Sequence, residues 1–76
     1  MRLLIGDTIQ WVAKAGTLKG QIGNIKLDLN AAGQTIPWLT VENVVCESTT
    51  MRRDHSNVVL PGTDGYFAMM KVEVLA

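Results

Sequence analysis

The sequence of 76 residues lacks several features that mark particular protein classes. Its single cysteine, Cys46, cannot form an internal disulfide, which excludes a disulfide-stapled secreted scaffold. The opening MRLLIG has too few apolar residues for a signal peptide, and no run approaches the ~18 apolar residues of a membrane span. These features predict one cytoplasmic domain spanning residues 1–76, with no membrane partner.

Charge is also scarce. Charged residues make up 18% of the chain, and seven basic side chains balance seven acidic ones. The chain therefore has no basic excess of the kind that favours nucleic-acid binding. Hydrophobic residues make up 47%, which is a high share for a domain with so small an interior. We expect part of this apolar surface to contact a protein partner or a second copy of the chain.

Residues that carry chemistry are few, and their spacing is unfavourable. Asp54, His55 and Ser56 are consecutive, and neighbouring side chains of an extended segment point to opposite faces, so they cannot form a hydrolase triad. One histidine and one cysteine cannot supply the four ligands of structural zinc. Cys46, beside two valines, is typical of a buried structural cysteine. We therefore expect no enzyme activity, no metal, no cofactor and no small-molecule substrate.

Strand signals dominate what is present. Alternating or β-branched segments predict strands over residues 3–13, 20–29, 35–41, 57–60 and 66–76. The last two strands are predicted to form a hairpin, and the polar residues 47–57 are predicted to form a long loop. Residues 41–45 fit either a short 3₁₀ turn or a continued strand. About five short strands joined by glycine-containing turns predict an all-β fold, closed as a small SH3-like barrel.

The second predicted strand carries a break in its alternation. The alternation predicts that Ile25, Leu27 and Leu29 point toward the core and that Lys26 and Asp28 point out, but Ile22 precedes Ile25 by three residues instead of two. One extra residue at Gly23 would return both isoleucines to the same face, which is the effect of a β-bulge. The sequence therefore predicts a bulge at this glycine and a bend in the strand.

With these strands in place, residues 6–45 resemble the KOW motif of SH3-like barrels in ribosomal proteins and transcription elongation factors. The matching stretches are GDTI at residues 6–9, KGQIGNI at 19–25 and VENV at 41–44. Asn43 stands where that family usually has glycine, and the chain is neutral where KOW ribosomal proteins are basic. The resemblance implies an SH3-like barrel whose partner is RNA, a polymerase or a ribosome.

Two surfaces are candidate sites. On the predicted last strand, Phe67 and Met69 share a face, and an adaptable apolar face of this kind suits a protein partner or self-association into a homo-oligomer. The alternative is a nucleic-acid patch that combines cations with a stacking face, formed by Arg52, Arg53, Lys19 and Trp38.

The functional hypothesis that follows is a non-enzymatic interaction module that binds a protein or a second copy of itself. Two alternatives stand beside it. One is a KOW-type module associated with nucleic acid, a ribosome or a polymerase. The other is a structural or accessory subunit of a phage-like assembly, in which the apolar last strand joins neighbouring subunits.

Overall fold

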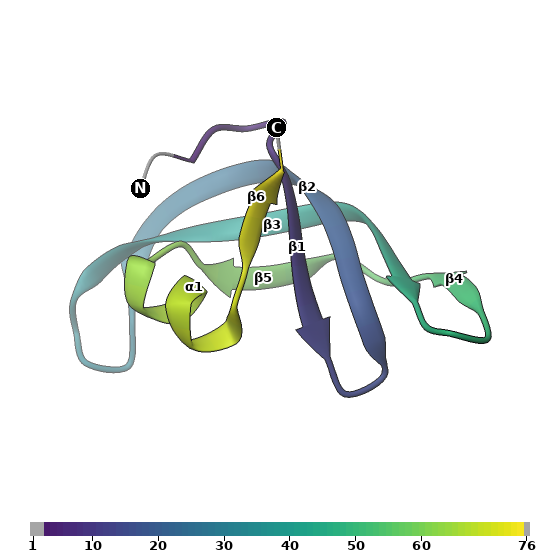
Figure 1. The fold of residues 1–76 in the computed structure, drawn as a ribbon. Coiled ribbons are helices and arrows are strands. Elements are labelled where there is room, and N and C mark those ends of the chain that lie inside the picture. The colour runs from purple at the N-terminus through teal and green to yellow at the C-terminus, as the bar shows by residue number, and fades with distance from the viewer. Residues whose placement is uncertain (1–2, 76) are drawn as a thin grey trace.

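A computed structural model describes residues 3–75, which form six strands and one short helix (Figure 1). In chain order these are β1 (Thr8–Ala13), β2 (Gly16–Leu29), β3 (Thr35–Glu47), β4 (Arg52–Asp54), β5 (Val58–Pro61), α1 (Asp64–Met70) and β6 (Glu73–Leu75). All strand pairs are antiparallel and follow the order β4-β3-β2-β1-β6, with β5 pairing to β3. The predicted all-β class is confirmed, and the path of paired strands is open. The segment expected to be a long loop contains β4.

The two long strands, β2 and β3, organise the molecule because each takes part in two regions of the sheet. Residues 16–21 of β2 pair with β1, whereas residues 38–41 of β3 pair with β5. Between these regions the β2–β3 register shifts between Ile22 and Asn24. Ile22 is fully buried and Ile25 packs against the same core. The predicted bulge is therefore confirmed, together with the role expected for it.

A second register shift, around Gly20, was not predicted. A Cβ on Gly20 would lie 2.7 Å from Val41 Cγ1 and 2.9 Å from the carbonyl oxygen of Glu42, so the two strands approach too closely for a side chain there. On the facing strand, Asn43 has a φ of 52°, in the left-handed region. A 3₁₀ turn over residues 41–45 is wrong, because β3 continues and Asn43 absorbs the irregularity.

The prediction of a last strand over residues 66–76, paired with the preceding strand, is wrong. The segment forms α1 and then β6; β6 pairs with β1, and β5 pairs with β3. The Oγ1 atom of Thr63 accepts a hydrogen bond from the backbone N–H of Tyr66 at 3.2 Å, which caps the helix. Lys71, with a φ of 53°, ends it. The turn signal PGTDG therefore contains a helix start, and Phe67 turns inward.

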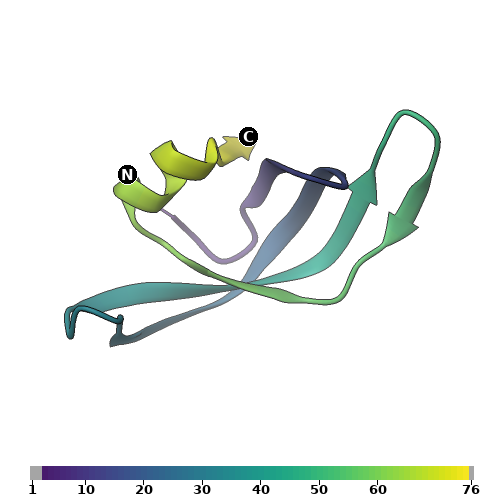
Figure 2. The same cartoon turned by 90° about the horizontal axis from the view of Figure 1, so that it is seen from below.

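The core lies on the inner face of the sheet and is closed by α1. Its buried residues are Ile9, Trp11, Leu18, Ile22, Leu39, Val41, Val44, Leu60 and Phe67. From this core the paired ends of β2 and β3 extend as a hairpin that we call the arm (residues 24–40); its base still packs in the core through Ile25 and Leu39. Figure 2 shows the arm running out past α1, and the molecule measures 40 × 22 × 22 Å as a result of this extension and the β4 hairpin.

Candidate interaction surfaces

The outer face of the central sheet carries opposite charges in close alternation. Residues in cross-strand register point to the same face. One such row runs from β6 to β4 through Glu73, Gln10, Lys19, Val45 and Asp54. The row therefore sets one cation among two carboxylates, a pattern that does not favour a polyanion.

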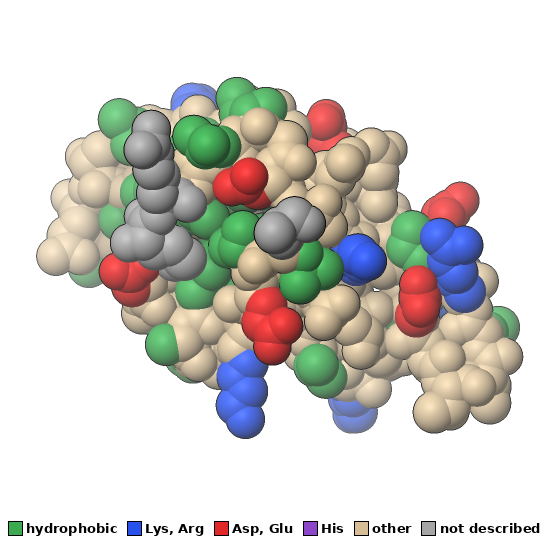
Figure 3. Space-filling model, turned by 45° about the horizontal axis from the view of Figure 1, so that its top comes forward, with side chains coloured by type: hydrophobic (Ala, Val, Ile, Leu, Met, Phe, Trp, Pro, Cys, Tyr) green, Lys and Arg blue, Asp and Glu red, His purple; other side chains and the backbone are tan. Residues whose placement is uncertain are grey.

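The neighbouring row repeats this pattern. Arg52 is in register with Glu47, and its Nε lies 3.5 Å from Glu47 Oε1 in an exposed ion pair. Lys19, Glu47 and Arg52 line one shallow hollow on this face. On the face drawn in Figure 3, Lys and Arg side chains are likewise interspersed with Asp and Glu. The cations of the expected nucleic-acid patch thus have carboxylates beside them.

The structure brings only part of that patch together. Lys19 and Arg52 line the same hollow, but Arg53 is in register with Cys46 and so lies on the opposite face of β4 from Arg52. Trp38 lies on the arm, in a separate hollow. The four residues proposed for nucleic acid therefore do not share one surface.

The expected protein-binding pair is also separated. Phe67 belongs to the core, with 4% of its surface exposed, whereas Met69 is 70% exposed. The expectation that both share an exposed face rested on the period of a strand. In a helix the two residues are about 200° apart, so one turns inward while the other faces solvent. Met69 alone remains an exposed apolar residue of this pair.

The outer face of the arm has an aromatic centre, and we call it the Trp38 face. Trp38 is half-buried and stands in register between Lys26 of β2 and Pro61 of β5. Val59, in the next row, is 60% exposed. A hollow on this face is lined by Asn24, Lys26, Asp28, Leu29, Trp38, Thr40 and Val59. A tryptophan ringed by polar groups is the composition that binding hot spots favour.

The opposite face of the arm is apolar as well. Ile25 is in register with Leu39 and packs against the core. Leu27 and Leu29, predicted to point inward with Ile25, continue the same side of β2 but lie beyond the end of the core. They are 70% and 61% exposed. The prediction that Leu27 and Leu29 point into the core is therefore wrong, because the core ends at Ile25, and the arm has apolar side chains on both faces.

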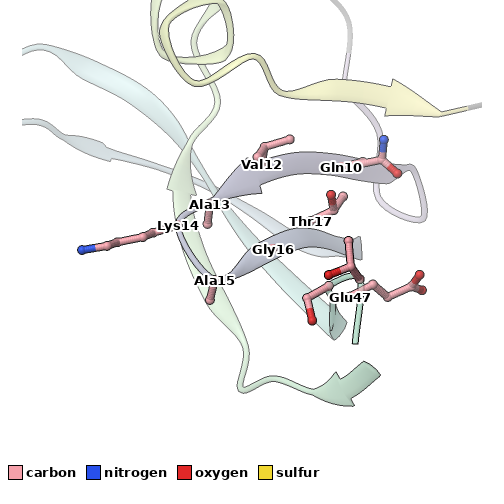
Figure 4. A pocket seen from close by; sticks show the side chains of 10 residues that line it. Gln10, Val12, Ala13, Lys14, Ala15, Gly16, Thr17 and Glu47 are labelled. Carbon is pink, nitrogen blue, oxygen red and sulfur yellow. The ribbon is translucent and has the colours of Figure 1, made fainter. Parts of the chain in front are cut away.

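A further hollow lies where the β1–β2 turn meets the end of β3 (Figure 4). Much of its wall comes from small residues, among them Ala13, Ala15 and Gly16. Figure 4 shows Lys14 pointing away from the other labelled side chains. No pair of charged groups converges here among the lining residues, so this hollow provides backbone and hydroxyl contacts without reactive chemistry.

The residues considered for chemistry take structural or solvent-exposed positions. His55 is exposed, and its Nδ1 lies 2.8 Å from the backbone carbonyl oxygen of Ser56. Cys46 is half-buried against the core, with its Sγ 4.0 Å from the carbonyl oxygen of Ala15. Across the described residues, no cluster of three or more His, Cys, Asp or Glu side chains could hold a metal ion.

Comparison of the chain with protein-family models, with curated proteins and with solved structures finds no match. Within residues 3–75, no helix has the length and apolar character needed to cross a membrane. The candidate site therefore depends on the geometry of this chain alone, and the arm exposes two large apolar side chains, Leu27 and Leu29, on one element.

Proposed function

We propose that this chain is a small SH3-like β-barrel that works as a non-enzymatic interaction module. Its docking element is the arm, and its partner is a protein. The observation that carries the proposal is the apolar surface on both faces of the arm: the exposed Leu27 and Leu29 on one face, and the half-buried Trp38 with the neighbouring Val59 of β5 on the other.

The strand arrangement supports an SH3-like barrel. One half of the sheet contains β6, β1 and the first part of β2; the other contains the second part of β2 with β3 and β5. The bent β2 is shared between the halves, and both halves contribute residues to one core. The short helix α1 links β5 to β6 across the end of that core. Small barrels are built from short, strongly bent strands of this kind.

The structure offers a physical explanation for one position at which this chain differs from the KOW motif. Asn43 replaces the glycine that is usual in the motif, and its φ of 52° lies in the left-handed region, which glycine adopts without steric cost. Asparagine is among the residues that tolerate this region best. Its Nδ2 also donates a hydrogen bond to Gln21 Oε1 at 3.3 Å, which ties the irregular part of β3 to β2. Asparagine is therefore compatible with the left-handed backbone that this chain has at the position of the motif's glycine.

A protein is favoured over a nucleic acid because of where the charges lie. Lys19 and Arg52 alternate with carboxylates on the central sheet, so phosphate contacts there would also bring phosphates beside Glu47 and Asp54. The arm offers an apolar surface in which a central tryptophan is surrounded by polar groups. Such a surface suits a protein partner.

Site-specific photo-crosslinking in the native cells tests the proposal. A photoreactive residue placed at Leu27 or Val59 should form a protein adduct, whereas one placed at Met69 should not. Met69 is a matched control because it is apolar and as exposed as Leu27, but it lies on α1 instead of the arm. Mass spectrometry of the adduct identifies the partner. Absence of protein adducts from both Leu27 and Val59 would overturn the proposal.

A further inference from the structure

The arm has a free strand edge. Strand β1 covers β2 only over residues 16–21, and the next residue, Ile22, exchanges backbone hydrogen bonds with Gly6 and Asp7 at 2.7 and 2.9 Å. Beyond this point, none of the described residues pairs with the outer edge of β2 over residues 24–29. An unpaired edge of this length presents backbone donors and acceptors to another strand.

Hydrogen bonds at both ends of the arm show which residues point their backbone groups outward. Asn30 N donates to the carbonyl oxygen of Gln34 at 2.8 Å, so Asn30 faces β3. The carbonyl oxygen of Pro37, opposite Leu27, accepts from Gly62 N at 2.7 Å and so points away from β2. Because backbone groups alternate along a strand, Leu27 and its odd-numbered neighbours present their N–H and C=O groups to the free edge.

We infer that this edge pairs with the same edge of a second copy, antiparallel, about a two-fold axis at Leu27. The inference rests on the proposed function, because it names the partner that docks on the arm. The segment NIKLDLN, residues 24–30, is close to a palindrome in chemical type. About this axis Leu27 opposes Leu27, Ile25 opposes Leu29, and Lys26 of each copy opposes Asp28 of the other. The outward backbone groups of the odd-numbered residues then meet one another, as an antiparallel ladder requires.

Charge selects this register over its neighbours. An axis at Lys26 would set two lysines opposite each other, and an axis at Asp28 would set two aspartates opposite each other. A parallel, in-register pair would oppose like charges at both positions. Axes between residues would set outward backbone groups against inward ones, so no ladder would form. The axis at Leu27 is the one that opposes Lys26 to Asp28 twice, since each contact of a two-fold interface occurs twice.

In the single chain, Asp28 contacts groups that would change partners in the dimer. Asp28 Oδ1 accepts a hydrogen bond from the backbone N–H of Leu29 at 2.8 Å, and Asp28 Oδ2 lies 4.0 Å from Lys26 Nζ. In the pair, the Leu29 N–H donates to the carbonyl of Ile25 in the other copy. Asp28 is then free to meet the opposite Lys26. The exposed Leu27 and Leu29 of both copies join one continuous apolar stripe.

Charge reversal in the purified full chain tests the pairing. Sedimentation equilibrium should find the wild type dimerising, with Lys26→Asp or Asp28→Lys alone raising the dimer Kd by about tenfold or more, because each variant opposes like charges twice. The two variants mixed in equal amounts should form a heterodimer, since every Asp then faces a Lys. The double variant K26D/D28K should dimerise like the wild type.

A backbone variant checks the ladder independently of charge. Leu27→Pro removes an N–H that faces the free edge and not β3, so circular dichroism should stay unchanged while the dimer is lost. A wild type that stays monomeric at high concentration, or single variants that do not form a heterodimer when mixed, would overturn the pairing. Adducts of Leu27 or Val59 with a different protein would then leave the proposed function standing, whereas absence of all arm adducts would remove both.

Discussion

At the scale of single residues, two backbone positions allow the paired strands β2 and β3 to approach closely where the sheet bends. Gly20 has no side chain to meet Val41 and the carbonyl of Glu42, and Asn43 takes a left-handed conformation on the facing strand. Together they interrupt a regular ladder where the sheet bends. A bend of this kind separates the part of the molecule that holds the core from the part that forms the arm.

Replacing Gly20 with alanine should therefore destabilise the protein by about 1–3 kcal/mol, the range found when atoms are forced into a packed interior. The new Cβ would meet the buried Val41 side chain and rigid backbone, neither of which can move easily. Gly65→Ala is the matched control, because a Cβ there meets nothing within 4 Å and alanine favours the helix. Urea denaturation measures both. Equal effects at the two positions would contradict the account.

Asn43 leads to predictions of different size for two substitutions. Asn43→Gly should change the free energy of unfolding by less than about 1 kcal/mol, because glycine adopts a positive φ at no steric cost and only one exposed hydrogen bond is lost. Asn43→Val should cost about 1–2 kcal/mol or more, because a β-branched residue is strained there. Thermal unfolding of the two variants checks this. Similar melting temperatures for both would argue against a left-handed residue at position 43.

At the scale of elements, α1 marks where sequence reasoning reaches its limit. Alternation predicted a strand over residues 3–13, which contains β1, and the bulge at Gly23, because period and register are local properties. For residues 66–70 the apolar residues are nearly continuous, so they fit a strand as well as a short helix. The cap at Thr63 decides between the two.

The site was harder to predict for the same reason. Whether Leu27 and Leu29 are buried depends on where the core ends, and this depends on long-range packing of β5 and α1. The pairing of β6 with β1 is likewise a contact between the two ends of the chain. The alternation of residues 24–30 was visible in the sequence, but their lack of a partner strand was not.

Within α1, Phe67 and Met69 should respond very differently to truncation. Phe67→Ala should cost about 3–5 kcal/mol, because it leaves a cavity in the core. Met69→Ala should change the free energy of unfolding by less than about 0.5 kcal/mol, since its side chain is exposed on the opposite side of the helix. Chemical denaturation compares the two. A large loss of stability for Met69→Ala with a small loss for Phe67→Ala would contradict the inward position of Phe67 on α1.

The N-cap gives a second prediction for this element. Thr63→Ala should lower the free energy of unfolding by about 1 kcal/mol, because the backbone N–H of Tyr66 loses its acceptor. Thr63→Ser should retain most of the stability, since serine also caps well. Thermal melts measure the difference. Equal loss in both variants would show that the hydroxyl does not cap α1.

At the scale of the whole molecule, the central sheet and the arm present different surfaces. The outer face of the central sheet sets cations beside carboxylates. The arm exposes Leu27 and Leu29 around the charged pair Lys26 and Asp28, and its Trp38 lies beside Val59 of β5. Pairing of two arms would extend one sheet across two copies without changing the core of either.

This distribution predicts weak contact with polyanions. At about 50 mM salt, the purified chain should not be retained on single-stranded DNA or RNA columns, because it has no basic excess to release counterions. Elution that shifts strongly with salt would contradict this and favour the nucleic-acid alternative. The variant Glu47→Gln, which removes the carboxylate beside Arg52, is an informative comparison.

Amide hydrogen exchange at successive residues of the arm tests the central claim most directly. The amides of Lys26 and Asp28 face β3 and should be protected at every protein concentration. The amide of Leu27 faces the free edge, so it should exchange rapidly in dilute protein and become protected as the concentration rises. Rapid exchange of the Leu27 amide at all concentrations, with its neighbours protected, would contradict the pairing of two arms.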